Sequence, residues 1–183
     1  KTISGKDTVY LTFVSDSIQV RYTYSGPTST YLSTAFAPNG IIVVKDANVR
    51  LQGTVIGQYT VASSSTLGGK GNIYLDDDIV CKNSPRTNQS SEDILGIVAK
   101  NNVVITENSA NNSSINIDAS IYCEKGSFSA ERYDKRPISG AINLFGGVVQ
   151  KTRGAVGTLD SKGSIKNGFS KSYRYDDRLL LMS

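Results

Sequence analysis

The chain contains no histidine and no tryptophan, and its 183 residues include only one methionine, two cysteines and four prolines. Histidine is the usual general base of nucleophilic catalysis and the commonest ligand of catalytic zinc. Its absence excludes Ser–His and Cys–His mechanisms, whereas an enzyme that works with carboxylates alone stays open. We therefore expect a protein that is not an enzyme and that needs no cofactor.

Long apolar runs are missing as well. No stretch approaches the roughly 18 consecutive apolar residues of a membrane-spanning helix, and the chain begins at Lys1 without a signal peptide. We expect any membrane contact to depend on an N-terminal anchor that this sequence lacks. The 20 basic and 16 acidic residues are scattered. Because no Lys/Arg stripe with interleaved aromatics is present, nucleic acid is not an expected partner.

The residues that are present favour an all-β domain. Short runs of Val, Ile and Leu are separated by Gly, Ser, Asn and Asp, which is the composition of strands and turns. A chain of this length can bury a core without metal or disulfide support.

An internal repeat indicates the architecture. Four segments read apolar, x, apolar, x, small or acidic, x, apolar, and a fifth copy is less complete: residues 49–55, 73–79, 115–121, 142–148 and 94–98. We predict that their second apolar residues stack in one column: Leu51, Leu75, Ile94, Ile117 and Leu144. A second column is expected at Val61, Ile105, Phe128 and Val156. Repeats of this kind are typical of solenoids.

The sequence therefore predicts a right-handed parallel β-helix, a single-stranded solenoid of about five to six coils. An antiparallel sandwich or barrel is the alternative, because it also has short strands at regular spacing. We expect N-terminal strands and a cap over 1–38, including a hairpin or lid, the β-helix over 39–160 with a loop insertion at 82–93, and a C-terminal cap and apolar tail over 161–183.

One acidic cluster is a candidate metal site. Its members are Asp76, Asp77, Asp78, Glu92 and Asp93. Calcium prefers several oxygen ligands, and stacked coils can bring carboxylates together. The spacing matches no ordered calcium motif, so a solvated turn is the favoured interpretation. Carboxylate catalysis on sugars would also depend on these residues, but we see no row of aromatics beside them for sugar stacking.

Two groups of basic residues form a candidate patch for acidic glycans or phospholipid head groups. The first is Lys151 with Arg153, and the second is Arg132 with Lys135 and Arg136. The alternative is that these residues form the polar faces of strands and a loop.

The two cysteines are predicted to be free. The repeat places Cys81 and Cys123 in one column but two coils apart, which is about 9.6 Å and beyond the reach of a disulfide. We expect two buried thiols that behave as small hydrophobic residues. A disulfide in an oxidising compartment is the competing interpretation.

Several segments resemble a group of bacterial envelope proteins, which have a pilin-like or single-span N-terminus followed by a β-helical domain. These segments are 53–63, 93–99, 126–128, 146–154 and 173–178. The resemblance extends over about residues 39–178, and a weaker one links the chain to the bactofilin β-helices. It implies a secreted, surface-exposed or pilus-associated domain without known catalytic residues. This chain lacks the hydrophobic N-terminal segment of that group.

We therefore expect a structural or adhesive domain of a bacterial cell-surface, pilus-associated or filament-forming protein, extracellular or at the cell surface. Its partners would be further copies of itself or a surface ligand. The alternative is a carbohydrate-binding or carbohydrate-active protein that uses the loop at 82–93.

Overall fold

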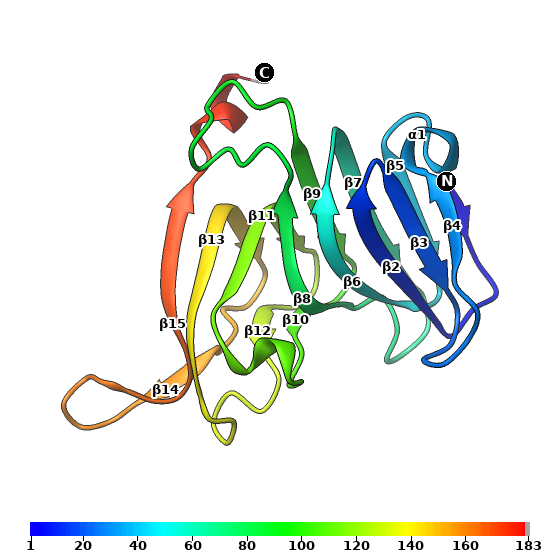
Figure 1. The fold of residues 1–183 in the computed structure, drawn as a ribbon. Helices are drawn as coiled ribbons and strands as arrows, with labels where there is room; N and C mark the ends of the chain where they lie inside the picture. The colour runs from blue at the N-terminus through cyan, green and yellow to red at the C-terminus, as the bar shows by residue number, and fades with distance from the viewer. Residues whose placement is uncertain (182–183) are drawn as a thin grey trace.

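The computed structural model describes residues 1–181, and most of them lie in one sheet of fifteen strands. The sheet is curled and mostly parallel, so that the molecule has the form of a half-barrel (Figure 1). Within these residues, antiparallel pairs occur only between β2 and β3, β3 and β4, and β14 and β15. The prediction of an all-β chain with parallel strands is confirmed at this level.

The strands are β1 (Thr2–Ile3), β2 (Thr8–Ser15), β3 (Ser17–Arg21), β4 (Ser29–Leu32), β5 (Ile41–Lys45), β6 (Asn48–Val55), β7 (Gln58–Ser64), β8 (Ile73–Cys81), β9 (Ile94–Ala99), β10 (Val103–Ile105), β11 (Ile115–Cys123), β12 (Phe128–Ala130), β13 (Ile138–Gln150), β14 (Gly157–Leu159) and β15 (Ile165–Tyr175). The helices are α1 (Ser33–Phe36), η1 (Ala110–Asn112) and η2 (Asp177–Leu181).

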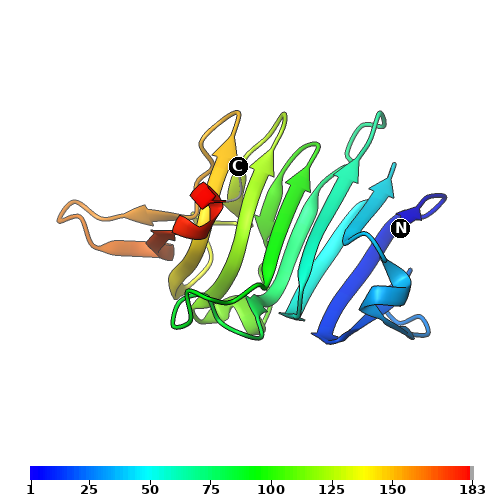
Figure 2. The ribbon, with the colours of Figure 1, turned by 90° about the horizontal axis from the view of Figure 1, so that it is seen from above.

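From β5 to β13, strands that follow one another in the chain alternate between two series of parallel pairs. One series joins β2, β6, β8, β10 and β12, and the other joins β1, β5, β7, β9 and β11. β11 continues to β13 and β15. Each connection between β5 and β13 therefore carries the chain from one series to the other, and Figure 2 shows the strands running side by side.

The core lies inside the curl and follows the predicted two-residue alternation. Val49 lies opposite Ile73, and Leu51 lies opposite Leu75. Both pairs are fully buried. The residues between them point outward, because successive side chains of a strand point to opposite faces. The repeat thus identified buried positions correctly, and further along the chain Ile117 lies opposite Leu144, as expected.

The single column of five residues is wrong, and one cause is a bulge in β8. Between the pair Leu51–Leu75 and the pair Gly53–Ile79, the one residue Gln52 faces the three residues 76–78. Extra residues in one strand shift its later residues against the neighbouring strand. Ile117 consequently lies opposite Ile79 and not opposite Leu75.

Ile94 belongs to the other series, where it lies opposite Gln58. The second predicted column is divided in the same way. Val61 lies opposite Ile97, whereas Ile105 lies opposite Leu75. Both series have the same alternation of apolar and polar residues, so the pattern alone does not tell them apart.

Both ends of the sheet differ from its middle. At the N-terminal end, β2 and β3 form the expected hairpin, but β2 also pairs with β6 along its whole length. The hairpin is therefore part of the sheet and not a lid. At the other end, β14 and the start of β15 project from the body (Figure 1). Residues 182 and 183 of the expected tail lie outside the described residues.

Candidate functional site

The acidic run at 76–78 forms the bulge of β8, and its three carboxylates have different surroundings. Asp76 accepts hydrogen bonds from Nε and Nη2 of Arg50, at 2.8 and 2.6 Å. Asp78 accepts two from the backbone N and the side-chain amide of Asn116, at 2.7 and 2.8 Å. Asp77 is exposed and contacts only the backbone N of its neighbour. Two of these carboxylates therefore bind donors on adjacent strands.

Asp93 lies apart from this run. It is buried and accepts hydrogen bonds from the backbone N of Gly57 and from two N–H groups of Asn83, at 2.7 to 3.0 Å. Glu92 beside it is exposed. Within residues 1–181, no group of three or more acidic or cysteine side chains is placed to hold a metal ion. The calcium candidates are thus not brought together.

A row of aromatic and arginine side chains crosses four strands on the outer surface. In register, Tyr10 lies opposite Arg21 on one side and Arg50 on the other, and Arg50 lies opposite Tyr74. The Arg21 guanidinium is 4.6 Å from the centre of the Tyr10 ring, and that of Arg50 is 5.6 Å from the Tyr74 ring. Cation–π contacts of this kind stabilise the row.

This row corrects the expectation that aromatics do not accompany the acidic residues, because Arg50 also binds Asp76. Its members come from β2, β3, β6 and β8. They become neighbours only through strand register. The alternation in the sequence shows that these side chains point outward, but it does not show which strands pair and so place them in one row.

A shallow depression of about 200 Å³ lies beside the row. It is lined by Tyr10, Thr12, Gln19, Arg21, Thr28 and Gln52. Thr12 lies opposite both Gln19 and Gln52. The depression therefore presents hydroxyl, amide and guanidinium groups next to a tyrosine ring.

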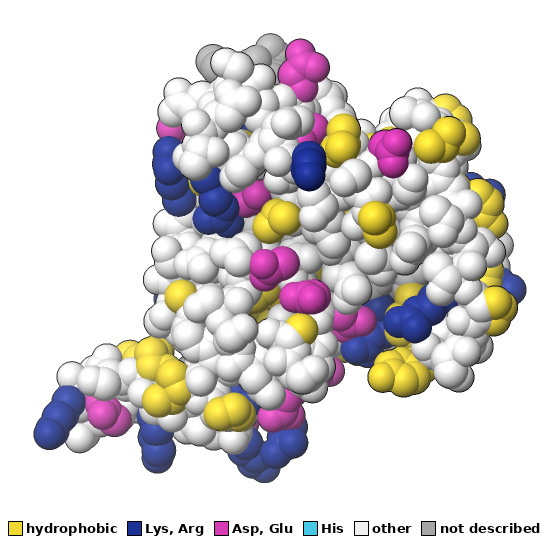
Figure 3. Space-filling model, in the orientation of Figure 1, with side chains coloured by type: hydrophobic (Ala, Val, Ile, Leu, Met, Phe, Trp, Pro, Cys, Tyr) yellow, Lys and Arg dark blue, Asp and Glu magenta, His cyan; other side chains and the backbone are white. Residues whose placement is uncertain are grey.

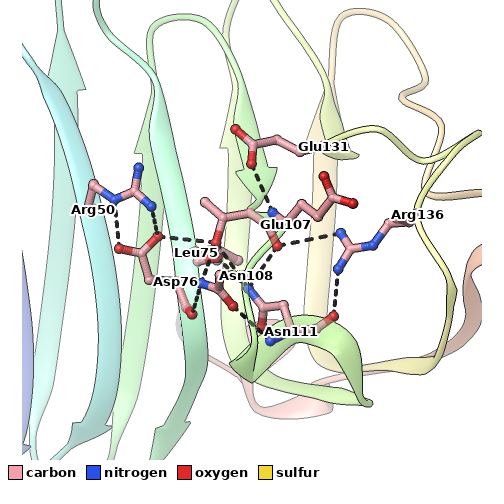
Figure 4. A network of polar contacts seen from close by, with 9 residues as sticks. Arg50, Leu75, Asp76, Glu107, Asn108, Asn111, Glu131 and Arg136 are labelled. Atoms are coloured by element: carbon pink, nitrogen blue, oxygen red, sulfur yellow. Dashed lines mark hydrogen bonds and ion pairs between the residues drawn. The ribbon is translucent and has the colours of Figure 1, made fainter.

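A polar network connects Asp76 with the interior (Figure 4). The hydroxyl of Thr106 donates to Leu75 O at 3.0 Å and to Asp76 Oδ1 at 3.2 Å. The amide of Asn111 donates to Leu75 O at 3.0 Å, and Arg136 Nη2 donates to Asn111 O at 2.5 Å. The network joins β8 to the segments after β10 and β12.

Arg136 is fully buried, so it is not part of a surface patch. Its guanidinium lies 4.5 Å from the centre of the Phe169 ring. Burial lowers the pKa of Arg136, while Glu107 and Glu131 oppose this shift. Arg132, in contrast, is exposed and forms an ion pair with Glu107 at 3.0 Å. Arg132, Lys135 and Arg136 therefore do not form one surface patch.

Stacked asparagines connect successive strands of one series. Asn48 Oδ1 accepts hydrogen bonds from the backbone N and the side-chain amide of Asn72, both at 3.1 Å. Asn72 Oδ1 accepts the same two bonds from Asn102, at 3.1 and 3.0 Å. Asn102 Oδ1 then accepts one from Ser127 N at 2.9 Å. Sequence reasoning missed this ladder, although each asparagine or serine stands just before an apolar strand.

The loop at 82–93 contains no helix or strand and is held from two sides. Arg86 Nε donates to Asp118 at 2.7 Å, and its Nη2 donates to Asn143 O at 2.6 Å. From the C-terminal segment, Arg178 Nη1 donates to Ser91 O at 2.5 Å and to Asp93 O at 3.2 Å. The loop is thus fixed to the sheet and to η2.

Both cysteines are free and buried. They do not share the predicted column, because Cys81 lies opposite Val55 and Cys123 lies opposite Ala99. Burial, together with the charge of Asp118, raises the pKa of the Cys81 thiol to about 12. Burial also raises the pKa of Cys123. A thiol that stays protonated is a poor nucleophile.

Lys151 and Arg153 are exposed and follow the end of β13. Among residues 1–181, no helix combines the length and the apolar character that a membrane crossing requires.

Comparison of the chain with protein-family models, with curated proteins and with solved structures finds no match.

Proposed function

We propose that this chain is a structural or adhesive β-helical domain of a bacterial cell-surface, pilus-associated or filament-forming protein. The observation that carries the proposal is the ladder of Asn48, Asn72 and Asn102. These side chains bind backbone N–H groups of the next strand at sequence separations of 24, 30 and 25 residues. Ladders of this kind hold successive coils of a solenoid at a fixed spacing and make it stiff.

The buried charges support a structural role. The four buried charged side chains among residues 1–181 are Asp93, Asp118, Arg136 and Asp176. Asp93, Asp118 and Arg136 each form a hydrogen bond to another segment, and Asp176 binds the arginine that holds the 82–93 loop. Buried charges that are satisfied by hydrogen bonds in this way are commonly structural.

We further propose that the curled sheet is the body of a closed, right-handed β-helix. The alternation of successive strands between two parallel series supports this, since parallel strands joined by short connections cross over right-handedly in nearly all known sheets. A crystal structure tests it. An open half-barrel or a left-handed winding would overturn this part of the proposal.

The N-terminal end offers a route to self-association. β4 is exposed at all four positions and pairs with β3 on one side only. An exposed edge strand is a template for pairing with another chain. A contact between this end and the opposite end of a second copy would not close, and would produce a filament.

Sedimentation velocity over a range of concentrations, with negative-stain microscopy, tests this function. We expect oligomers that grow with concentration and thin filaments. Leu32→Lys, at a 59% exposed position of β4, should reduce assembly strongly, whereas Leu67→Lys, at a 55% exposed turn position, should not. Monomers at every concentration, together with no adherence to bacterial or host surfaces, would reject the proposal.

Carbohydrate binding is a second candidate, favoured by the depression beside the tyrosine and arginine row. Amide and hydroxyl groups bind sugar hydroxyls, and a tyrosine ring offers an apolar surface. A glycan array would identify a ligand, and a lyase assay on the same glycans would reveal cleavage. Gln19→Ala should then lower affinity at least about tenfold, while Gln58→Ala, at an exposed position of β7, should leave it unchanged. Equal affinity of the two variants would exclude this depression as the binding site.

A further inference from the structure

The net positive charge of the chain is concentrated near its C-terminal end. Between residues 151 and 174 there are six basic side chains and only one acidic side chain, Asp160; the basic ones are Lys151, Arg153, Lys162, Lys166, Lys171 and Arg174. The whole chain has a net charge of +4. The remainder of the protein is therefore close to neutral, and this segment is strongly cationic.

None of these six side chains forms an ion pair with a carboxylate of residues 1–181. Elsewhere, for example at Arg50, Arg86 and Lys100, basic side chains are paired. Arg153 and Lys171 are close enough for the charge of Arg153 to lower the pKa of Lys171, although burial is the larger cause. Two cations that lie together without a counter-charge form a site for an anion.

The surface between these two cations is an apolar groove. It has a volume of about 640 Å³ and lies along the hairpin of β14 and β15. Arg153 and Lys171 line it together with Val156, Ile165 and Phe169. A ligand that fits this surface combines an anionic group with an apolar part.

The hairpin itself projects from the body, with basic and hydrophobic side chains on it (Figure 3). Leu159 is 61% exposed, and Ile165 is half-buried. Lys162 lies in the connecting turn, and Lys166 lies at the start of β15. A soluble polyanion such as an acidic polysaccharide would not bury an exposed leucine on such a projection. A lipid surface would bury it, because apolar side chains enter the region below the head groups.

We propose that the β14–β15 hairpin binds the surface of an anionic lipid bilayer. Arg153 and Lys171 contact the anionic head groups, and Leu159 and Ile165 enter the interface. Lys162 and Lys166 add attraction over a range of about 8–10 Å at physiological salt. This inference does not depend on the proposed scaffold function, and it gives the chain a peripheral membrane contact that needs no membrane-spanning segment.

Co-sedimentation with lipid vesicles tests the proposal. One set contains phosphatidylcholine only, and the other contains about 30% phosphatidylglycerol. We expect binding to the anionic vesicles alone, falling steeply as sodium chloride is raised. The double variant Arg153→Glu/Lys171→Glu should lose more than about tenfold in affinity, and Leu159→Ser should lose several-fold.

Matched controls separate the site from general effects of charge and apolarity. Lys125→Glu and Leu67→Ser alter an exposed lysine and an exposed leucine outside the hairpin and should bind like the unaltered protein. Circular dichroism confirms that each variant is folded. Equal binding to neutral vesicles, or unchanged binding by the double variant, would overturn the proposal. Binding to soluble heparin that Leu159→Ser does not weaken, without binding to vesicles, would assign the site to a polyanion instead.

Discussion

The carbonyl oxygen of the Asn72 side chain accepts two hydrogen bonds from Asn102, one from its backbone N and one from its side-chain amide. The two residues are 30 positions apart and lie at the starts of consecutive strands of one series. A single side-chain amide therefore fixes the start of β10 against the start of β8.

Asn72→Ala should destabilise the protein by about 2 kcal/mol, because the half-buried N–H of Asn102 loses its partner and the bonds to Asn48 are lost. Asn112→Ala is the matched control, since its side chain is exposed on η1. We expect the control to change the free energy of unfolding by less than about 0.5 kcal/mol. Urea unfolding followed by circular dichroism measures both. Similar stability of the two variants would show that the ladder is incidental.

Arg136→Ala should cost about 3 kcal/mol or more, because it removes the largest fully buried side chain and its bond to Asn111 O. Lys135→Ala, at the exposed neighbouring position, should be close to neutral. Thermal unfolding compares the two variants. A melting temperature of Arg136→Ala equal to that of Lys135→Ala would mean that the network in Figure 4 contributes little.

Asp76→Asn and Asp77→Asn distinguish a structural role from a calcium site. The first change weakens the bonds from Arg50 and should lower stability by about 1–3 kcal/mol, while the second should have almost no effect. Because the carboxylates of Asp76 and Asp78 already bind N–H donors, we expect millimolar calcium or EDTA to leave the melting temperature unchanged. A rise with calcium that Asp77→Asn abolishes would restore the metal site.

The Cys81 thiol has a pKa of about 12 in the folded protein, against an ordinary value of 9.0. Folding therefore favours the protonated thiol, and this contribution to stability is complete below pH 9. It is lost as the pH rises from about 9 toward 12. Over this pH range, the free energy of unfolding should fall more steeply for the unaltered protein than for Cys81→Ala. The same pH dependence in both proteins would contradict a raised pKa of Cys81.

Both thiols should also resist iodoacetamide in the folded protein and react in urea, because they are buried. Mass spectrometry with and without reductant measures labelling. Rapid labelling of the native protein would show that one thiol is accessible.

The sequence predicted the buried side chains well because alternation within a strand is a local property. Val49, Leu51, Ile73 and Leu75 were placed inward from their spacing alone, and they pair as expected. Which strands become neighbours is not local. It depends on the path of the connections, which the alternation of apolar and polar residues does not show, so Ile94 was assigned to the wrong series.

In the candidate site, too, local features were predicted and features that depend on strand pairing were not. The acidic run at 76–78 was visible in the sequence, but its role in a bulge was not, because a bulge is defined by the partner strand β6. The row of Tyr10, Arg50 and Tyr74 likewise exists only once three strands are in register. Arg136 shows the opposite error, since a basic residue in a polar segment was expected at the surface and tertiary packing buried it.

Arg178 in η2 holds the loop at 82–93 through hydrogen bonds to Ser91 O and Asp93 O. The loop therefore has one of its two anchors more than eighty positions away in the sequence. Loss of the Arg178 guanidinium alone would free that side of the loop, so that cleavage of the loop by a protease reports on a contact that the loop itself does not encode.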